Sequence, residues 1–321
     1  MTHNMLAATI RSFNGIEGIT IEELPIPEPL DHEVQIAIKC AGVNPVDWKI
    51  TEGHLSTRMP YQFPIILGWD AAGEISKVGS DVSGFKVGDP VFTYCRKESI
   101  HDGAYASYIC LDSRNVAHKP KALNFAQAAS IPLSALTAWQ SLYEAAHLKK
   151  GETILIHAGA GGVGGFAIQF AHNTGSFIIS TASKGRTSYV KGLGADEVID
   201  YTEQDFVKKI LEKYPEGIDV VFDTVGGETL KKSYQVLKWG GRLITIAGIP
   251  EQTLAEQKNI ETSFVFVRPD GKQLSHFAQL VDKGKLKPPI IQEVPLHEIQ
   301  LALRKSREGH TQGKIVINIE S

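Results

Sequence analysis

The segment with the clearest chemical potential is a glycine-rich stretch that follows an apolar run. Residues 153–158 read TILIHA, and the GAGGVG after them places glycines in the pattern GxGxxG. Such glycines permit a tight turn, let the backbone approach a pyrophosphate and let the following helix pack closely. The helix N-terminus also presents unpaired N–H groups and a partial positive charge to the phosphates. The residues expected to bind a dinucleotide here are Gly159, Gly161, Gly162, Val163 and Gly164. The alternative is a tight strand-to-helix turn without a ligand.

The end of the next expected strand, residues 177–182, indicates which dinucleotide binds. An NAD site usually has an acidic residue about 20 positions after the glycines, where it binds the ribose 2′-hydroxyl. Here Ser183 lies 22 positions after Gly161 (183 − 161), and neither the strand nor the eight residues after it contain Asp or Glu. Ser183, Lys184 and Arg186 instead offer a hydroxyl and two cations, which bind a 2′-phosphate. These residues favour NADP(H); the alternative is an ordinary solvated turn.

The pattern of expected secondary structure around these motifs changes near residue 125. Before it, β-rich runs at 34–40, 71–78, 89–94 and 105–111 alternate with glycine turns, and no helix of convincing length appears. This pattern is typical of a compact barrel or sandwich. After it, expected strands and helices alternate, which predicts a doubly wound parallel sheet. The expected strands are 153–158, 177–182, 197–199, 219–223 and 242–247, with helices at 134–146, 163–173, 188–193, 203–213 and 228–237.

The last part of the chain contains a mixture of expected helices and strands. Residues 250–262 are polar and are expected to form a linker. A short apolar segment at 264–267, helices at 273–283 and 297–308, and a final strand at 314–319 are expected to follow it. We therefore expect two domains. The first comprises residues 1–124 and 255–321, and the second residues 125–254.

Composition excludes several classes of protein. The 321 residues contain 33 basic and 36 acidic side chains, so a net charge of −3 offers no electrostatic footprint for nucleic acid or an anionic membrane. The longest apolar runs are about six residues, whereas a membrane span needs about 20. Only three cysteines occur, without a CxxC pair, which fits neither a zinc ribbon nor a disulfide scaffold. The N-terminus resembles no targeting segment, so the expected location is the cytoplasm.

Together, several motifs carry a family resemblance over nearly the whole chain. They are AGVNPVDWK (41–49), FPIILGWDAAGEISKVGSDVSGFKVGD (63–89), AASIPLSALTAW (128–139), AGAGGVG (158–164), LGADEVIDY (193–201) and HTQGKIVI (310–317). In order and spacing the chain resembles the medium-chain dehydrogenase/reductase superfamily, and within it the zinc-independent quinone oxidoreductases and enone reductases. The resemblance implies a GroES-like β-barrel domain, a Rossmann domain and an active cleft between them.

The same resemblance bears on metal chemistry. Zinc alcohol dehydrogenases supply a Cys and a His at positions that correspond to Asn44 and Trp69 here. Trp cannot ligate zinc, and Asn is a poor ligand for it. Cys95 and His101 lie on one loop but provide only two ligands, so the expected metal set is empty. Without a Lewis acid, a conjugated acceptor is the easier substrate, because hydride addition gives an enolate or hydroquinone whose charge is delocalised. A quinone or an α,β-unsaturated carbonyl is therefore expected.

The resemblance also assigns roles to single residues. Asn44 would bind the substrate oxygen or the nicotinamide ribose, and its alternative is a turn before Pro45. Lys49 would stabilise an enolate or relay a proton, and its alternative is a solvated surface lysine. Both are the expected catalytic residues.

The remaining assignments concern the cofactor. Thr137 and the segments Ala247–Gly248 and Phe264–Val265–Phe266 would lie near the nicotinamide, Tyr201 near the adenosine 2′-phosphate, and Lys314 near the cofactor cleft. A rim aromatic is the alternative for Tyr201, and surface charge is the alternative for Lys314. The family likeness further implies a homodimer formed through edge strands of the nucleotide domain. Two other functions remain open: an NADP(H)-binding sensor or crystallin-like protein without turnover, and a relative of the zinc alcohol dehydrogenases.

Overall fold

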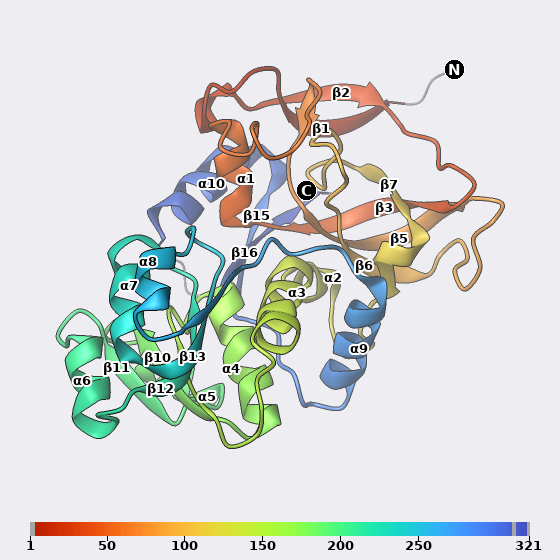
Figure 1. Cartoon of the computed structure of the whole chain (residues 1–321). Helices are drawn as coiled ribbons and strands as arrows, with labels where there is room; N and C mark the ends of the chain where they lie inside the picture. The colour runs from red at the N-terminus through yellow and green to blue at the C-terminus, as the bar shows by residue number, and fades with distance from the viewer. Residues whose placement is uncertain (1–3, 310–312, 320–321) are drawn as a thin grey trace. The chain divides into compact units, whose positions relative to one another are not determined.

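The computed structural model describes residues 4–309 and 313–319, and in it the chain forms two compact units (Figure 1). Unit 1 comprises Met1–Leu133 and Arg268–Ser321, and unit 2 comprises Ser134–Val267. The first three residues of the motif at 310–317 lie outside the described residues. Unit 1 is therefore discontinuous in sequence, with unit 2 inserted into it.

Unit 1 contains two sheets. The smaller has the order β2-β1-β4, and the larger has the order β15-β16-β3-β5-β6-β8, with β7 also pairing with β3. The strands are β1 (Asn4–Ile10), β2 (Thr20–Pro25), β3 (Glu33–Gly42), β4 (Ile65–Ile66), β5 (Asp70–Val78), β6 (Pro90–Tyr94), β7 (Tyr108–Asp112), β8 (Val116–His118), β15 (Ile291–Pro295) and β16 (Lys314–Asn318). The helices are α1 (Pro45–Thr51), α2 (Phe125–Ala129), α9 (Gly271–Asp282) and α10 (Ile299–Glu308), with α3 (Pro132–Trp139) beginning there.

The ten-residue strand β3 organises the larger sheet. It pairs antiparallel with β5, β7 and β16, and its register places Gly42 opposite both Asp70 of β5 and Val316 of β16. The chain's N-terminal and C-terminal parts thus meet at one end of β3. The strand ends at the residue before Val43, so the next residues project from this meeting point.

The short helix α1 directly follows β3, although no helix was expected in this region. Its local sequence explains it: Pro45 is the first helical residue, where a missing N–H costs nothing, and Asn44 is the N-cap. The carboxylate of Asp47 accepts a hydrogen bond from the Asn44 backbone N–H at 2.7 Å. With only seven residues, the helix shows too little periodicity to be recognised from apolar spacing.

Unit 2 is built on a six-stranded parallel sheet in the order β11-β10-β9-β12-β13-β14, the order of a doubly wound dinucleotide-binding fold. Its strands are β9 (Thr153–Ile156), β10 (Phe177–Ala182), β11 (Glu197–Asp200), β12 (Ile218–Asp223), β13 (Leu237–Thr245) and β14 (Glu261–Phe264). Its helices are α4 (Gly162–Thr174), α5 (Thr187–Gly192), α6 (Phe206–Lys213), α7 (Gly227–Ser233) and α8 (Gln252–Glu256). The predicted α/β fold is confirmed.

Apolar side chains explain why these strands occupy the centre of unit 2. Leu155, Ile179, Val221 and Leu243, from four neighbouring strands, are buried in one cluster with Phe206 of α6. Helix α4 packs on β9 and β10, and α7 packs on β12 and β13. A parallel sheet is covered in this way because its crossover helices return over its faces.

The expected linker at 250–262 is wrong. These residues include α8 and the first two residues of β14, which pairs in parallel with β13 from Glu261 to Phe264. Leu254 and Ala255 of α8 pack on the core cluster. Edge-strand pairing uses backbone groups, so a polar sequence can form it without the apolar alternation that reveals other strands.

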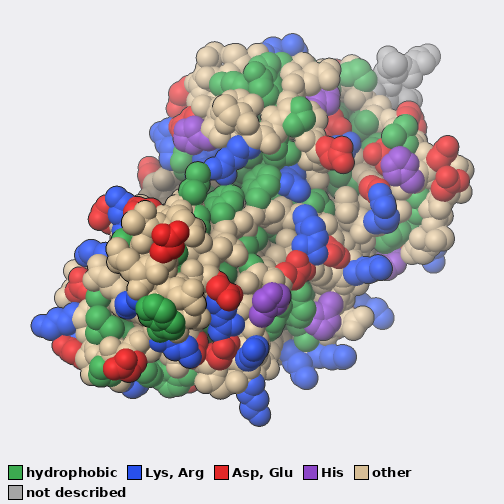
Figure 2. All heavy atoms as spheres, in the orientation of Figure 1, with side chains coloured by type: hydrophobic (Ala, Val, Ile, Leu, Met, Phe, Trp, Pro, Cys, Tyr) green, Lys and Arg blue, Asp and Glu red, His purple; other side chains and the backbone are tan. Residues whose placement is uncertain are grey.

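The unit boundaries and one helix also differ from expectation. The structure divides the chain after Leu133 and Val267 rather than after 124 and 254, because α2 packs on β3 and β5 and because β14 completes the other sheet. The helix expected at 134–146 begins at Pro132 as α3 and becomes π-helical over Gln140–Ala145. In the described part of the chain, no helix combines the length and apolarity needed to cross a bilayer. Figure 2 shows acidic and basic side chains interspersed over the face in view.

Candidate active site

In unit 2, the glycine-rich turn joins β9 to α4. Helix α4 begins at Gly162, with Gly161 as its N-cap, so its first N–H groups have no intrahelical acceptor. A Cβ at Gly164 would overlap the carbonyl oxygen of Ala158, and a Cβ at Gly159 would overlap the hydroxyl of Ser180. The nearest atom to a Cβ at Gly161 would be 3.3 Å away. Two glycines are thus required by packing, and the third lies where the helix presents its N–H groups.

A buried histidine forms hydrogen bonds beside this turn. His157 is the residue after β9, and its ring nitrogens lie 3.1 Å from the hydroxyls of Thr181 and Ser233. The Ser233 hydroxyl donates to the Thr229 carbonyl, so it accepts from Nε2–H of His157, and Thr181 donates to Nδ1. The Thr181 hydroxyl also accepts the N–H of Ala158, a non-glycine residue with a left-handed φ of 52°. Burial lowers the pKa of His157 to about 3, which keeps the ring neutral.

The carboxyl end of β10 leads into the residues expected at the adenosine 2′-phosphate. Ser183 and Arg186 are half-buried, and Lys184 is exposed with its ammonium 2.5 Å from a carboxylate oxygen of Glu203. Tyr201, after β11, is 56% exposed, and its N–H donates to the Ala182 carbonyl. The pairing of β10 with β11 therefore brings Glu203 to a turn that contains no acidic residue in sequence.

The carboxyl ends of β12, β13 and β14 meet at the same edge of the sheet. Buried Asp223 accepts hydrogen bonds from the hydroxyl of Thr245 and from the N–H of Gly226, and the Thr245 hydroxyl accepts the N–H of Ala247. These bonds hold the turn Ala247–Gly248 in place.

The neighbouring segment and helix contain the remaining residues that the sequence assigned to the nicotinamide. The N–H of Val265 donates to the Thr245 carbonyl at 2.9 Å. Phe264 and Phe266 are 37% and 42% exposed, while Thr137 of α3 is buried.

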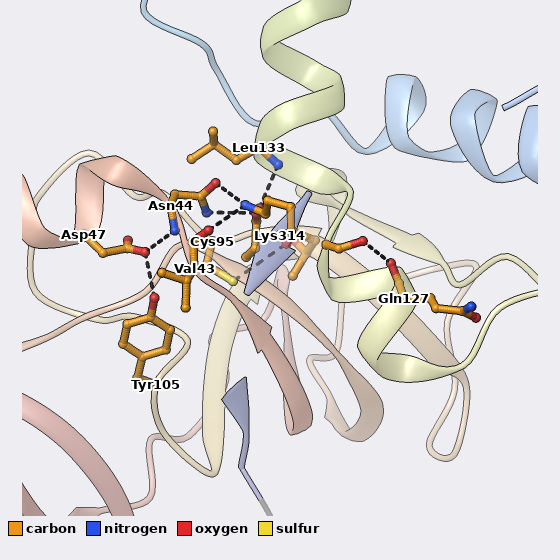
Figure 3. A network of polar contacts seen from close by, with 11 residues as sticks. Val43, Asn44, Asp47, Cys95, Tyr105, Gln127, Leu133 and Lys314 are labelled. Carbon is orange, nitrogen blue, oxygen red and sulfur yellow. Dashed lines mark hydrogen bonds and ion pairs between the residues drawn. The ribbon is translucent and has the colours of Figure 1, made fainter. Parts of the chain in front are cut away.

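In unit 1, Asn44 and Lys314 belong to one buried polar network (Figure 3). The Lys314 ammonium donates to the amide oxygen of Asn44 and, at 2.8 Å, to the Val43 carbonyl. The amide nitrogen of Asn44 donates to Asp70 Oδ2 at 2.9 Å, and this oxygen lies 3.5 Å from the ammonium. Asp70 Oδ1 accepts the N–H of Leu133 at 2.7 Å. Lys314 is 5% exposed as a whole residue, so surface charge does not describe it. Asn44 is 1% exposed and is also the N-cap of α1, so the turn before Pro45 and the buried network occur together at this residue.

A second carboxylate lies beside this cluster. Asp47 Oδ2 accepts hydrogen bonds from the hydroxyl of Tyr105 and from the backbone N–H of Asn44, both at 2.7 Å (Figure 3). Its other oxygen is buried and has no partner among the described residues. Burial raises the pKa of Asp47 to about 7, against the opposing effects of these hydrogen bonds and of Lys314. Burial likewise raises the pKa of Asp70 and lowers that of Lys314, while each charge favours the ionised form of the other.

Lys49 occupies the next part of α1. It is half-buried, its ammonium lies 5.5 Å from the ring centroid of Trp48, and burial lowers its pKa. Within residues 4–309 and 313–319 it has no carboxylate partner. The structure thus distinguishes Lys49 from a fully solvated lysine, and it shows no contact between Lys49 and the Asn44 cluster.

The described residues offer few donors for a metal ion. Among the described residues, no group of three or more His, Cys, Asp and Glu side chains is arranged to hold an ion. Trp69 is buried, and the amide oxygen of Asn44 already accepts from Lys314. Burial raises the pKa of Cys95 well above its ordinary value, so this residue remains a thiol at neutral pH.

Sequence reasoning brought Asn44 and Lys314 forward separately and missed Asp47, Asp70, His157 and Glu203. The motif NPVD contained a signal for Asp47, because an acidic residue three positions after an N-cap accepts the backbone N–H there. The others lacked such a local signal.

The parallel sheet, its glycine turn and the inserted arrangement of the chain define a dinucleotide-dependent oxidoreductase. Comparisons with known proteins agree. The alcohol dehydrogenase GroES-like domain matches residues 30–121, and the zinc-binding dehydrogenase family matches residues 193–317. The chain is 34% identical to quinone oxidoreductase of Homo sapiens, over 98% of this chain and 97% of that one.

Two further relatives extend the comparison. The NADPH-dependent alkenal/one oxidoreductase of Arabidopsis thaliana chloroplasts is 32% identical over 98% of this chain and 79% of its own length. The structure of the quinone oxidoreductase from Coxiella burnetii superposes with a TM-score of 0.88 at 32% identity, over 98% and 99% of the two chains. The chain therefore belongs to the medium-chain dehydrogenase/reductase superfamily, in its quinone oxidoreductase branch. It is an oxidoreductase that uses a nicotinamide cofactor.

Proposed function

We propose that this protein is a zinc-independent, NADPH-dependent reductase of quinones or α,β-unsaturated carbonyl compounds. The observation that carries the proposal is the glycine turn of unit 2, whose packing requires Gly159 and Gly164 and leaves the N-terminus of α4 to bind phosphate. The names of the relatives supply the substrate class. When bound, reduced nicotinamide supplies a hydride to the electron-poor double bond.

The cofactor would lie along the carboxyl edge of the parallel sheet. Gly159, Gly161, Gly162, Val163 and Gly164 would hold the pyrophosphate. Ser183, Lys184, Arg186 and Tyr201 would surround the adenosine 2′-phosphate, which makes NADPH the preferred form. Thr137, Ala247–Gly248 and Phe264–Val265–Phe266 would orient the nicotinamide. The hydrogen bonds from Thr245 to Asp223 and from Ala247 to Thr245 support this, because they fix the backbone of one of these segments.

The residues of unit 1 would act on the acceptor. Hydride addition at the β-carbon moves negative charge onto the carbonyl oxygen, and the α-carbon then takes a proton. Asn44 would donate a hydrogen bond to an oxygen of the substrate or of the cofactor ribose. Lys49, whose pKa is lowered by burial, would stabilise the enolate charge or pass on the proton. Lys314 would act beside the cofactor through its bond to Asn44.

No zinc is required in this proposal. By the family resemblance, Asn44 and Trp69 correspond to positions where zinc-dependent relatives supply ligands. Neither fits the role, because the indole has only an N–H donor and the amide oxygen is bound by Lys314. Activity should survive exhaustive chelation with EDTA, and metal analysis of purified protein should find no stoichiometric zinc. Turnover that disappears with EDTA and returns with zinc would contradict this part of the proposal.

We also propose a cytoplasmic homodimer formed through β14. This strand is the outermost in the order of the sheet and pairs only with β13 in the described residues, so its other edge has backbone groups to offer a second copy. Light scattering after size exclusion should give twice the 35.1 kDa mass of the chain. Thr262→Pro, which removes a backbone donor from this edge strand, tests whether β14 contributes to the interface.

The direct test of the reaction uses NADPH deuterated at C4. The label should appear at the β-carbon of a reduced alkenone, and solvent should supply the proton at the α-carbon. Deuterium at a carbinol carbon with the double bond intact would show carbonyl reduction instead and overturn the substrate class.

A further inference from the structure

The polar contacts of Asn44 allow its side-chain amide only one orientation. The oxygen Oδ1 accepts from the Lys314 ammonium, and Nδ2 donates to Asp70 Oδ2 at 2.9 Å. Rotating the amide by 180° would place its NH₂ group against an ammonium and its oxygen against a carboxylate. Both contacts would then be repulsive in a site where every participant is nearly fully buried. The two charged neighbours therefore determine which way the amide points.

The same contacts leave one part of the amide available. Nδ2 carries two hydrogens, and Asp70 accepts only one of them. The ammonium, the amide and the carboxylate form a closed ring, because Lys314 Nζ also lies 3.5 Å from the oxygen that accepts from Nδ2. The hydrogen within the ring must be the one on the same side as Oδ1. The second N–H points away from the ring and has no acceptor among the described residues.

The ring also strengthens this free donor. The Lys314 ammonium that donates to Oδ1 draws electron density from the amide, which makes its N–H groups better hydrogen-bond donors. Asp70 compensates the charge of Lys314. Asp70 also accepts a hydrogen bond from the Leu133 N–H, and Lys314 also donates one to the Val43 carbonyl. A donor preorganised in this way in a dry site costs little reorganisation when negative charge develops on a nearby oxygen.

We propose that Asp70 and Lys314 are positioning residues that hold the Asn44 amide so that its free N–H donates to a ligand oxygen, either the carbonyl of the acceptor or a ribose hydroxyl of the cofactor. This inference rests on the proposed function and names two residues that act through Asn44 rather than on the substrate. Lys314 thus acquires a role different from direct cofactor binding, and Asp70 acquires a functional role.

A double-mutant cycle tests the proposal. Asn44→Ala should lower kcat/KM about 10- to 100-fold, the effect of losing a hydrogen bond to a charged group. The pair Asp70→Asn with Lys314→Met removes both charges together, which avoids an unpaired buried charge. In the wild-type background this pair should lower kcat/KM by a similar factor. In the Asn44→Ala background it should change kcat/KM by less than about threefold, since the group it positions is gone.

The same variants show which ligand oxygen accepts the hydrogen bond from Asn44. If the oxygen belongs to the ribose, Asn44→Ala and the charge-pair variant should raise the dissociation constants of NADPH and NADH alike, measured by nicotinamide fluorescence without substrate. If the oxygen belongs to the acceptor, these constants stay the same and kcat falls. Either result supports the proposal.

An NMR measurement keeps the inference testable where the charge-pair variant does not fold. In the cofactor-free wild-type protein, the side-chain amide signals of Asn44 are identified by their absence in Asn44→Ala. The proton that Asp70 accepts should show stronger nuclear Overhauser contacts to Asp70 β protons than the other amide proton does, and it should exchange more slowly with solvent.

Three outcomes would overturn the proposal. They are amide protons of Asn44 without contacts to Asp70, equal losses from the charge-pair variant in both backgrounds, and unchanged kinetics and binding in Asn44→Ala. The deuterium-transfer experiment reports the reaction class independently of all three. A failure of the positioning role is therefore distinguishable from a failure of the proposed function.

Discussion

At the scale of the residue, the ion pair between Lys184 and Glu203 has a direct consequence for cofactor choice. The ammonium expected to bind the 2′-phosphate already has a carboxylate 2.5 Å away, which the phosphate must displace and whose charge repels it. Exposed ion pairs of this kind are worth roughly 0.2–1 kcal/mol. Glu203→Gln should therefore tighten NADPH binding up to about fivefold and leave NADH unchanged in fluorescence titrations.

Matched variants complete this comparison. Lys184→Ala with Arg186→Ala should weaken NADPH binding by roughly 10- to 100-fold without affecting NADH. Glu212 forms a similar ion pair with Lys209 on α6. Glu212→Gln should therefore change neither the NADPH nor the NADH dissociation constant. Equal wild-type affinities for the two cofactors would contradict the NADP(H) assignment.

Lys49 provides a second prediction for a single residue. Its charge would act after hydride transfer has begun, so Lys49→Met should lower kcat about tenfold while the NADPH dissociation constant stays within about twofold. The matched control is Lys86→Met, which changes an exposed lysine on a turn between β5 and β6. If the two variants behave alike in steady-state kinetics, Lys49 is a packing residue with no part in the chemistry.

At the scale of the element, the junction of β9 and α4 depends on a glycine that the helix cannot replace. A Cβ at Gly164 would overlap the backbone carbonyl of Ala158, so Gly164→Ala must displace the start of α4. Overpacking of this kind costs about 1–3 kcal/mol. We expect a lower thermal midpoint together with weaker NADPH binding, measured by calorimetry and fluorescence.

Gly192 offers the control for that element. It ends α5, and a Cβ there would meet nothing within 4 Å. Gly192→Ala should keep NADPH affinity unchanged and maintain or slightly raise stability, because alanine restricts the unfolded chain. If both variants bind NADPH as the wild type does, the glycine turn has no role in cofactor binding.

At the scale of the whole molecule, buried titratable groups give the free energy of unfolding a dependence on pH. The native pKa of His157 is about 3, below the ordinary value of 6.5. Between these values the unfolded chain binds a proton that the native state excludes, so stability falls as pH falls. The slope approaches about 1.4 kcal/mol per pH unit. Urea unfolding of His157→Gln from pH 7 to 4 should show a shallower decline than the wild type.

Asp47 contributes with the opposite sign. Its native pKa of about 7 lies above the ordinary 3.8, so the native state retains a proton that the unfolded chain releases between these values. This contribution to stability therefore decreases as pH rises from about 4 to 7. Relative to wild type, Asp47→Asn should become more favourable to stability as pH increases over that range. A difference independent of pH would show that Asp47 titrates normally.

Features that depend only on neighbouring residues were predictable from the sequence. The apolar run before the glycines, the helix after them and the alternating strands of unit 2 follow from local periodicity and turn chemistry, and the strand at 177–182 appears with the predicted bounds. The glycine turn was predictable because its steric requirements lie within one strand, one turn and one helix. The polar edge strand β14 and the seven-residue helix α1 were not predicted, because backbone pairing and helix capping leave little apolar pattern in the sequence.

Which charged side chains meet depends on the fold of the whole chain. Asn44 and Lys314 are 270 positions apart and come together because β16 pairs with β3, while β5 brings Asp70 to the same point. Likewise, the pairing of β10 with β11 places Glu203 beside Lys184, although the local sequence of that turn is purely basic. A residue type and its neighbours in sequence specify what a side chain can donate or accept. Its partner, and hence its orientation and pKa, depend on strand order, which brings distant parts of the chain into contact.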